Sequence, residues 1–295
     1  MDVNDPMKNT VIYKQDDRFT IKADFYATNH EKAPVVVYIH GGGLLWGTRE
    51  DLSEEMIKLY TNNGFALFSI DYRLAPESKL PDILEDVQDA LLWLETEGAK
   101  QFSIDPKRIA VVGGSAGGYL ALCTGTFKKK PRAIVSFYGY GDISANWATQ
   151  PSKFYLQKDI VPKELYKNFV SDEMITEGSI ETRFLLYLYA RQQGAWVQEI
   201  TGIHSTNKED LIQFCPIYHI TKDYPPTLLL HGTKDTDVPY EQSVFMRAAL
   251  IKEGVKTRLI TIPNGEHVFE KDFDHPIVQD ALNQVIEFLQ IHLSA

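Results

Sequence analysis

Short apolar runs alternate with helical patterns along almost the whole chain, and this alternation narrows the available folds more than any other feature. Continuous apolar or β-branched runs of this length are typical of strands buried on both faces of a parallel sheet. They lie at 35–39, 65–70, 109–113, 133–138, 227–230 and 258–262. Apolar spacing of three and four residues predicts helices between them, at 51–62, 82–96, 116–126, 241–252 and 276–292. Residues 19–27 alternate apolar and polar side chains, as an antiparallel strand does. The sequence therefore predicts an α/β fold with a mostly parallel central sheet of about eight strands and helices on both faces.

One stretch, residues 142–222, lacks any buried-strand pattern and is rich in aromatic residues. At roughly 80 residues it is far longer than an ordinary loop, so we expect it to carry its own helices and to form a lid. We interpret residues 1–295 as a single domain with 142–222 as a lid or cap insertion. Its aromatic side chains either line a substrate pocket or form a small core of the insertion itself.

Composition narrows the classes of partner. Lys and Arg number 30 against 40 Asp and Glu, a formal net charge of −10, with no clustered basic stripe. This balance argues against nucleic acid and anionic membranes as partners, and favours a small molecule. The only cysteines, Cys123 and Cys215, exclude a disulfide framework. The N-terminal residues lack the basic and apolar pattern of a signal peptide, and no apolar run is long enough to span a bilayer. We expect a soluble cytoplasmic protein, and the oligomeric state stays open, a homodimer included.

The most specific local motif is the G-x-S-x-G run at residues 113–117, centred on Ser115. It directly follows a predicted strand and precedes a predicted helix, a sharp reversal that needs small residues around an exposed, strained nucleophile. The Walker lysine of a phosphate loop and the glycine spacing of a dinucleotide site are both missing. The motif therefore predicts Ser115 as a nucleophile rather than part of a phosphate-binding turn.

A second motif, HGGG at residues 40–43, follows the predicted strand 35–39. Glycines at the end of a strand let the backbone approach a ligand closely and present bare N–H donors. Such donors stabilise the oxyanion of a tetrahedral acyl-transfer intermediate. Alone the motif could be a plain glycine turn, but together with Ser115 it predicts an anion site.

A serine nucleophile needs a base, and the base needs an acid to orient it. Among eight histidines, His267 follows the last predicted strand, on the sheet edge that also carries Ser115. The loop after the preceding strand offers two carboxylates, Asp235 and Asp237. We choose Asp235 as the acid and keep Asp237 as the alternative. The order Ser115, Asp235, His267 is that of the α/β-hydrolases.

These motifs resemble the α/β-hydrolase esterases, in particular the hormone-sensitive-lipase-like group of carboxylesterases. The matching segments are HGGG at 40–43, DYRLAPE at 71–77, GGSAGG at 113–118 and HGTKDTDVP at 231–239. The resemblance implies an oxyanion hole made by the backbone N–H groups of Gly42, Gly43 and Ala116. That group commonly has Asp before the nucleophile, where this chain has Gly114. This departure places the chain nearer to general esterase, feruloyl-esterase-like or kynurenine-formamidase-like relatives.

The resemblance implies a serine hydrolase, a carboxylesterase that cleaves short-chain or aryl esters through an acyl-enzyme. A small-amide hydrolase such as a formamidase or peptidase is the alternative, and a non-catalytic hydrolase-like binding protein is a third interpretation. Trp46, just after the glycine motif, is placed to touch the substrate or to pack on the sheet. No His, Cys and Asp cluster has metal-ligand spacing, so we expect neither a metal nor a cofactor.

Overall fold

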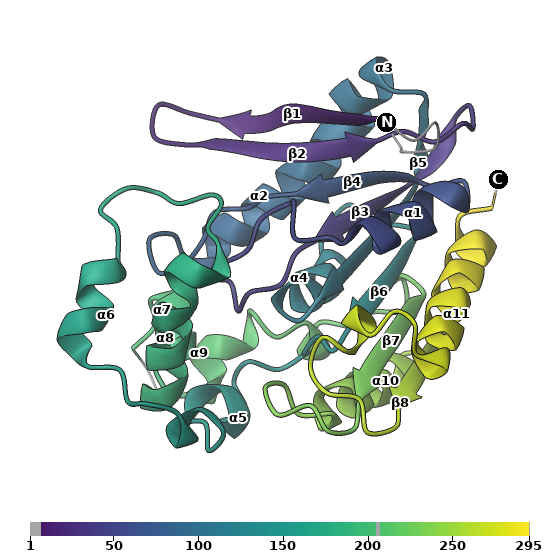
Figure 1. The fold of residues 1–295 in the computed structure, drawn as a ribbon. Coiled ribbons are helices and arrows are strands. Elements are labelled where there is room, and N and C mark those ends of the chain that lie inside the picture. The colour runs from purple at the N-terminus through teal and green to yellow at the C-terminus, as the bar shows by residue number, and fades with distance from the viewer. Residues whose placement is uncertain (1–6, 205–206, 295) are drawn as a thin grey trace.

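A twisted eight-stranded sheet organises the molecule (Figure 1). The structure is a computed structural model that describes residues 7–204 and 207–294. The strand order is β1-β2-β4-β3-β5-β6-β7-β8; the pairs β1/β2 and β2/β4 are antiparallel and all others are parallel. The strands are β1 (Lys8–Gln15), β2 (Thr20–Tyr26), β3 (Ala33–Ile39), β4 (Ala66–Ile70), β5 (Ile104–Gly114), β6 (Ala133–Phe137), β7 (Thr227–Gly232) and β8 (Thr257–Ile262). The predicted mostly parallel sheet of about eight strands is confirmed.

The edge strand β1 is the one strand that the apolar pattern does not predict. Its residues Lys8, Asn9, Thr10 and Lys14 are polar, and the strand is half exposed along its length. Its antiparallel pairing with β2 supplies the hydrogen bonds that hold it at the edge of the sheet. An exposed edge strand needs no continuous apolar run, which is why the buried-strand pattern does not detect it.

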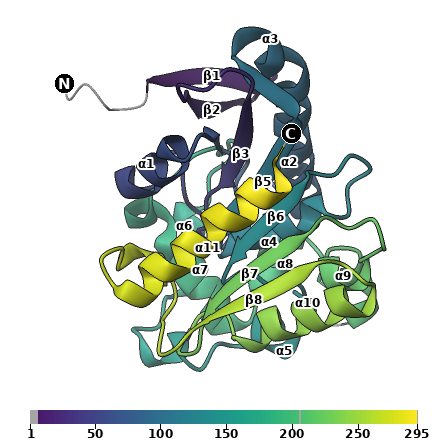
Figure 2. The ribbon, with the colours of Figure 1, turned by 90° about the vertical axis from the view of Figure 1, so that its right-hand side faces the viewer.

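Helices cover both faces of the sheet, as the sequence predicts. On one face α1 (Glu54–Asn62) and α11 (Pro276–His292) pack against alternate residues of the strands, and Figure 2 shows α11 lying across this face. The other face is covered by α2 (Leu80–Trp93), α4 (Ala116–Thr124) and α10 (Glu241–Lys252). A π-helical turn, η1 (Leu94–Gly98), and the short α3 (Ala99–Gln101) continue α2 towards β5. Each central strand is buried on both sides, which accounts for its unbroken apolar sequence.

The segment between β6 and β7 is built from helices in its described residues, with a single isolated bridge to Gly47 as its strand-like pairing. In Figure 1 these helices gather beside the sheet, at the ends of β3, β5 and β6. They are α5 (Asn146–Thr149), η2 (Tyr155–Gln157), α6 (Lys163–Phe169), α7 (Ile180–Gln193), α8 (Trp196–Thr201), α9 (Lys208–Ile212) and η3 (Pro216–Tyr218). The helix expectation for this segment is therefore met, while its role as a lid stays a prediction.

Within the described residues, no helix has both the length and the apolar character needed to cross a bilayer.

Candidate active site

Ser115 occupies the turn between β5 and α4, with its backbone in the left-handed region at φ 55°. Its N–H donates to the carbonyl of Phe137 at 2.9 Å, which fixes the turn to the end of β6. The turn is so tight that a Cβ at Gly117 would lie 2.0 Å from the carbonyl oxygen of Ile39. Only glycine fits there, so the small residues around Ser115 are required by close backbone packing.

His267 and Asp235 converge on this serine from the ends of β8 and β7. His267 Nε2 lies 3.0 Å from Ser115 Oγ, and His267 Nδ1 lies 2.7 Å from Asp235 Oδ2. The Oδ1 atom of Asp235 accepts the N–H groups of Asp237 and Val238, both at 2.9 Å. Three side chains separated by up to 152 residues thus form one hydrogen-bonded row.

The charges around this row favour an ionised acid and a basic imidazole. Burial alone disfavours the carboxylate of Asp235, but hydrogen bonds from His231 and His267 outweigh it and hold the pKa of Asp235 well below its usual range. Burial likewise lowers the pKa of His267. The hydrogen bond to Asp235, with the charges of Asp237, Asp235 and Glu270, more than offsets this and raises the pKa of His267 above its ordinary value.

Asp237, the alternative acid, lies on the other side of the imidazole. Its Oδ2 is 3.9 Å from Nε2 of His267, the nitrogen that faces Ser115. Its Oδ1 accepts the hydroxyl of Tyr187 at 2.7 Å, and its backbone carbonyl accepts Nη2 of Arg191 at 3.2 Å. The structure therefore brings Asp235, and not Asp237, against Nδ1 of His267.

The glycine motif lies beside the nucleophile. A Cβ at Gly41 would lie 3.4 Å from Cβ of Ser115, and both Gly42 and Gly43 have positive φ angles, 96° and 60°. Among residues 7–204 and 207–294, the backbone N–H groups of Gly42, Gly43 and Ala116 find no acceptor. Unpaired N–H groups are the kind of donor that an oxyanion needs.

Neighbouring side chains hold the glycine motif in place. The ring of His40 stacks on Tyr72 at 4.2 Å, and the Tyr72 hydroxyl donates to the carbonyls of His40 and Gly41 at 3.0 and 3.1 Å. Burial lowers the pKa of His40 to about 4, so its ring is neutral near pH 7. His40 therefore supports the backbone rather than acting as a second base.

The helical segment also reaches the glycine motif. Trp196 on α8 donates from Nε1 to the carbonyl of Gly43 at 2.9 Å, and Gly47 exchanges two backbone hydrogen bonds with Gly178, at 2.6 and 3.1 Å. The ring of Tyr187 on α7 packs so closely against Gly43 that a Cβ at Gly43 would lie only 2.5 Å from it. The glycine motif is thus fixed from the sheet and from the helical segment together.

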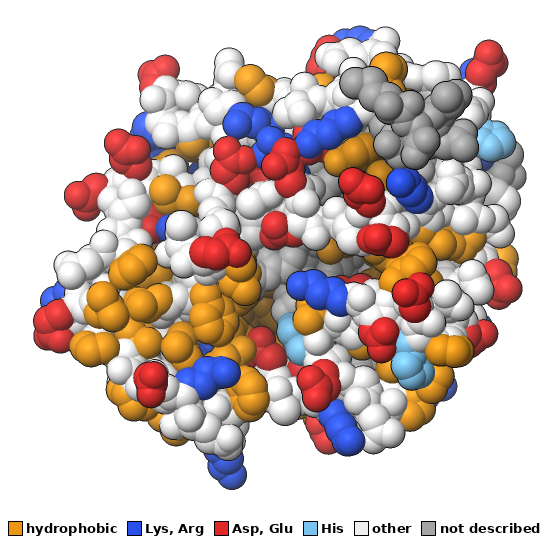
Figure 3. Space-filling model, in the orientation of Figure 1, with side chains coloured by type: hydrophobic (Ala, Val, Ile, Leu, Met, Phe, Trp, Pro, Cys, Tyr) orange, Lys and Arg blue, Asp and Glu red, His pale blue; other side chains and the backbone are white. Residues whose placement is uncertain are grey.

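Trp46 lies at the junction of these two regions and is partly exposed. Its ring meets those of Tyr187 and Phe184 edge to face, with centroids 5.0 and 5.6 Å apart. Five aromatic side chains of the segment are buried: Tyr155, Tyr166, Tyr187, Trp196 and Phe214. In Figure 3 hydrophobic side chains gather over α6 to α8 and border a hollow at the middle of this face. Trp46 and Phe184 are thus partly exposed and in contact with each other, while Tyr155 and Trp196 belong to the buried core.

Tyr138 and Glu270 lie near the base, and no sequence motif predicts either of them. The ring of Tyr138 packs against that of His267 with centroids 4.6 Å apart, and the Tyr138 hydroxyl donates to Glu270. A Cβ at Gly114 would lie 2.8 Å from the same hydroxyl. The glycine before the nucleophile is the one sequence signal of this contact, because it marks a place where another group comes close.

Arg191 and Tyr187 of the 142–222 segment are also missed, since nothing in their local sequence distinguishes them from core residues. Arg191 is 3% exposed and lies over the rings of Trp147, Tyr155, Tyr187 and Trp196 at 5.2 to 5.8 Å. Its guanidinium supports Asp237 from behind, with Nη2 3.8 Å from Oδ1.

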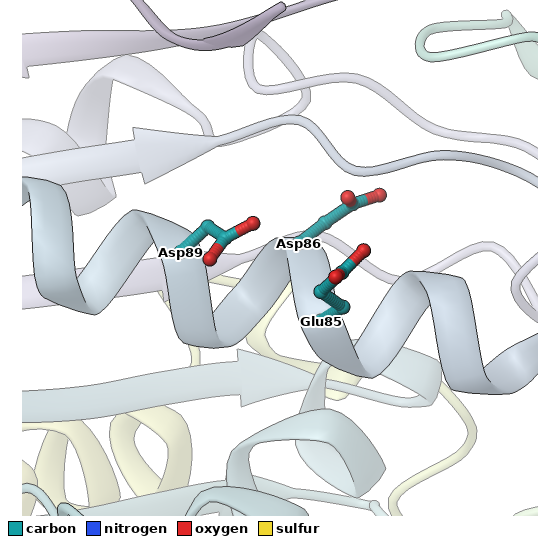
Figure 4. A group of neighbouring side chains, drawn as sticks. All are labelled: Glu85, Asp86 and Asp89. Carbon is teal, nitrogen blue, oxygen red and sulfur yellow. The ribbon is translucent and has the colours of Figure 1, made fainter.

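A group of three carboxylates on α2, Glu85, Asp86 and Asp89, is the one arrangement in the described part of the chain with the spacing of metal ligands (Figure 4). Protein cations already occupy it. Lys14 Nζ lies 2.7 to 2.9 Å from all three carboxylates, and Arg73 bonds Asp86 through Nε and Nη2. These carboxylates therefore join β1 and the loop after β4 to α2, and they offer no set of free ligands to a metal.

The arrangement around Ser115 suits one type of chemistry. A hydroxyl beside a basic imidazole that an ionised carboxylate orients, with N–H donors opposite, is the geometry of nucleophilic acyl transfer.

Comparison with known proteins agrees with this architecture. The family model BD-FAE matches residues 23–250. A solved α/β hydrolase superfamily protein from Enterococcus faecalis is 26% identical, with a TM-score of 0.77 over 96% of this chain and 98% of that chain. A structure described as bacterial heroin esterase has a TM-score of 0.74 over 100% of this chain and 87% of that chain; at 20% identity this likeness concerns the fold.

Among curated proteins, the non-reducing polyketide synthase Preu3 of Preussia isomera is 27% identical over 318 aligned residues. The alignment covers 88% of this chain but only 12% of that synthase. The chain therefore corresponds to a small part of this much longer relative. With the family match over most of its length and an α/β hydrolase as a full-length structural neighbour, the chain has the α/β-hydrolase fold and belongs to the BD-FAE family.

Proposed function

We propose that the protein is a carboxylesterase that cleaves short-chain or aryl esters of small molecules through an acyl-enzyme on Ser115. The observation that carries the proposal is the hydrogen-bonded row from Asp235 through His267 to Ser115, with spacings of 2.7 and 3.0 Å. Membership of the BD-FAE family and the α/β hydrolase structural neighbour support a hydrolase. Both cysteines are free and buried, which fits action in the cytoplasm.

In the acylation step, Ser115 Oγ attacks the ester carbonyl while Nε2 of His267 takes its proton. Asp235 stabilises the imidazolium that forms and holds the ring in the required tautomer. Negative charge develops on the carbonyl oxygen, where the N–H groups of Gly42, Gly43 and Ala116 would bind it. The imidazolium then gives its proton to the departing alkoxide, and the alcohol leaves.

In the deacylation step, a water molecule attacks the acyl-enzyme, and His267 takes a proton from this water. The same three N–H groups bind the second oxyanion. Collapse of this intermediate releases the carboxylic acid and returns the proton to Ser115. No other group is needed for the reaction to balance.

Residues 142–222 act as the lid in this proposal. Trp46, just after the glycine motif, and Phe184 on α7 are partly exposed and meet edge to face, and in this proposal they contact the substrate. The formamidase-like alternative uses the same row of side chains on an amide, so substrate comparison has to separate the two.

A chain-length series of p-nitrophenyl esters, from acetate to decanoate, tests the proposal. We expect Ser115-dependent turnover with kcat/KM highest for short acyl groups, and Ser115→Ala as the blank. A fluorophosphonate probe should label Ser115 in the folded protein. Absence of both turnover and labelling would favour the non-catalytic interpretation, while faster hydrolysis of formyl-kynurenine than of p-nitrophenyl acetate would favour the amidase.

A further inference from the structure

The Nε2 side of His267 carries a second carboxylate, Asp237, that the acyl-transfer mechanism does not use. Its Oδ2 lies 3.9 Å from Nε2, whereas Asp235 serves Nδ1 at 2.7 Å. Nε2 is the atom that delivers a proton to the departing alcohol, so the leaving oxygen must come within hydrogen-bond distance of it. Asp237 Oδ2 therefore lies beside the place of the leaving group.

The structure holds this carboxylate in one orientation. Oδ1 is fixed by the Tyr187 hydroxyl at 2.7 Å, and Arg191 lies behind it, 3.8 Å from Oδ1 and bonded to the Asp237 carbonyl. The Tyr155 side chain faces the same carboxylate. With Oδ1 anchored from the helical segment, Oδ2 points towards His267, and the Asp237 side chain keeps 12% of its surface exposed.

The surroundings favour a positive group at this position. The charges of Asp237, Asp235 and Glu270 together raise the pKa of His267. A field that favours the imidazolium also favours any other cation placed beside Nε2. The net charge of −10 also favours the approach of cationic esters.

We propose that Asp237 is a substrate-recognition residue, and that the enzyme prefers esters whose leaving alcohol carries an ammonium group close to the ester oxygen. The N–H⁺ of the ammonium donates to Oδ2 of Asp237, while the ester carbonyl lies against Ser115. A carboxylate on the same part of the alcohol is repelled. This inference rests on the proposed esterase function and adds the chemistry of the leaving group.

A matched pair of substrates tests the inference. 2-(Dimethylamino)ethyl acetate, protonated at pH 7, and 3-methylbutyl acetate have the same shape and acyl group, and differ in N–H⁺ against C–H. Rates are corrected with Ser115→Ala. For the wild type we expect kcat/KM to favour the ammonium ester by about tenfold, the effect of one hydrogen bond to a charged group. Acetoxyacetate, with an anionic leaving group, should be the poorest substrate.

In Asp237→Asn the ratio between the two esters should fall to about twofold or less, since the amide keeps an acceptor but loses the charge. The matched control is Glu241→Gln, an exposed carboxylate at the start of α10, which should keep the wild-type ratio. Thermal unfolding shows whether each variant is folded, and Asp237→Ser replaces Asp237→Asn if the latter is not.

Each outcome decides the matter. A wild-type ratio near one, or a ratio that survives in Asp237→Asn, overturns the inference while the esterase function stands. A preference found only for 2-hydroxyethyl acetate over propyl acetate also overturns it, because a neutral donor would then suffice. Loss of all Ser115-dependent hydrolysis instead removes the esterase function itself.

Discussion

The carboxyl-terminal edge of the sheet and the helical segment between β6 and β7 both border Ser115, but they position their groups by different means. At the sheet edge, the backbone conformation positions the groups. Ser115 and Gly43 have positive φ angles of 55° and 60°, and a side chain added at Gly43 would collide with its neighbours. In the helical segment, side chains pack on one another, as Tyr187 does on Trp46 and Trp196. We infer that the first region sets the rate and the second sets the choice of substrate, and the following predictions test this division.

The largest effect should follow from Ser115→Ala. Removing the nucleophile should lower kcat by about six orders of magnitude, leaving only the contribution of the N–H donors and of binding. Stopped assays with p-nitrophenyl acetate at high enzyme concentration measure the remainder. Loss of less than tenfold would mean that another group carries the reaction.

The next largest effect should come from Asp235→Asn. The amide would favour the wrong tautomer of His267, and kcat should fall by about four orders of magnitude. Asp237→Asn provides the comparison at the same histidine. If Asp237→Asn were the more damaging change and Asp235→Asn the milder one, the acid would be wrongly assigned.

Gly43→Ala tests the backbone of the first region directly. A Cβ at this position would lie 2.5 Å from the Tyr187 ring, so the loop must shift and move its N–H group. We expect kcat to fall by about 10²-fold, as for the loss of an oxyanion donor. The control is Gly254→Ala, which has a similar φ of 77° but nothing within 4 Å of the added carbon; it should lose a little stability and keep its kcat.

A change in the second region should act on binding. Trp46→Ala removes the edge-to-face contacts with Phe184 and Tyr187 and, in the proposal, a contact with the substrate. KM for short esters should rise by less than tenfold, while kcat stays within a small factor, because no reacting group moves. If kcat of Trp46→Ala fell as much as kcat of Gly43→Ala, the two regions would not have the separate roles that we infer.

The smallest expected effect is a shift in the pH dependence of kcat/KM. His267 must be neutral to accept the proton, so kcat/KM falls on the acid side as the imidazole becomes protonated. Asp237 helps to raise the pKa of His267, and Asp237→Asn should lower that pKa and move the acid limb to lower pH by a fraction of a unit. A limb that moves to higher pH would contradict the charge effect assigned to Asp237.

The sequence predicts these two regions unequally, for a physical reason. Strands such as β5 and β6 are buried on both faces, so nearly all of their side chains must be apolar. The resulting continuous apolar runs locate these strands in the sequence. The glycines around Ser115 are likewise forced by backbone approach. The nucleophile, base and acid positions follow from strand ends, and the structure brings them within hydrogen-bonding distance.

The other groups near Ser115 have no local sequence pattern that predicts their position. Tyr187, Arg191 and Glu270 reach the site through tertiary contacts, and a tyrosine or arginine on a helix has the same sequence pattern whether it faces the core or the site. Edge strand β1 escapes detection because half of its surface is exposed. The aromatic residues of the segment could be assigned neither to the pocket nor to a separate core from sequence, and the structure buries some of them, such as Trp196, while Phe169 and Tyr218 are exposed.

The indole of Trp196, bonded to the carbonyl of Gly43, has a consequence for how the enzyme cycles. That carbonyl belongs to the same short loop whose amides are proposed to receive the oxyanion. Because the bond joins α8 to this loop, a displacement of α8 would be transmitted to the proposed oxyanion donors.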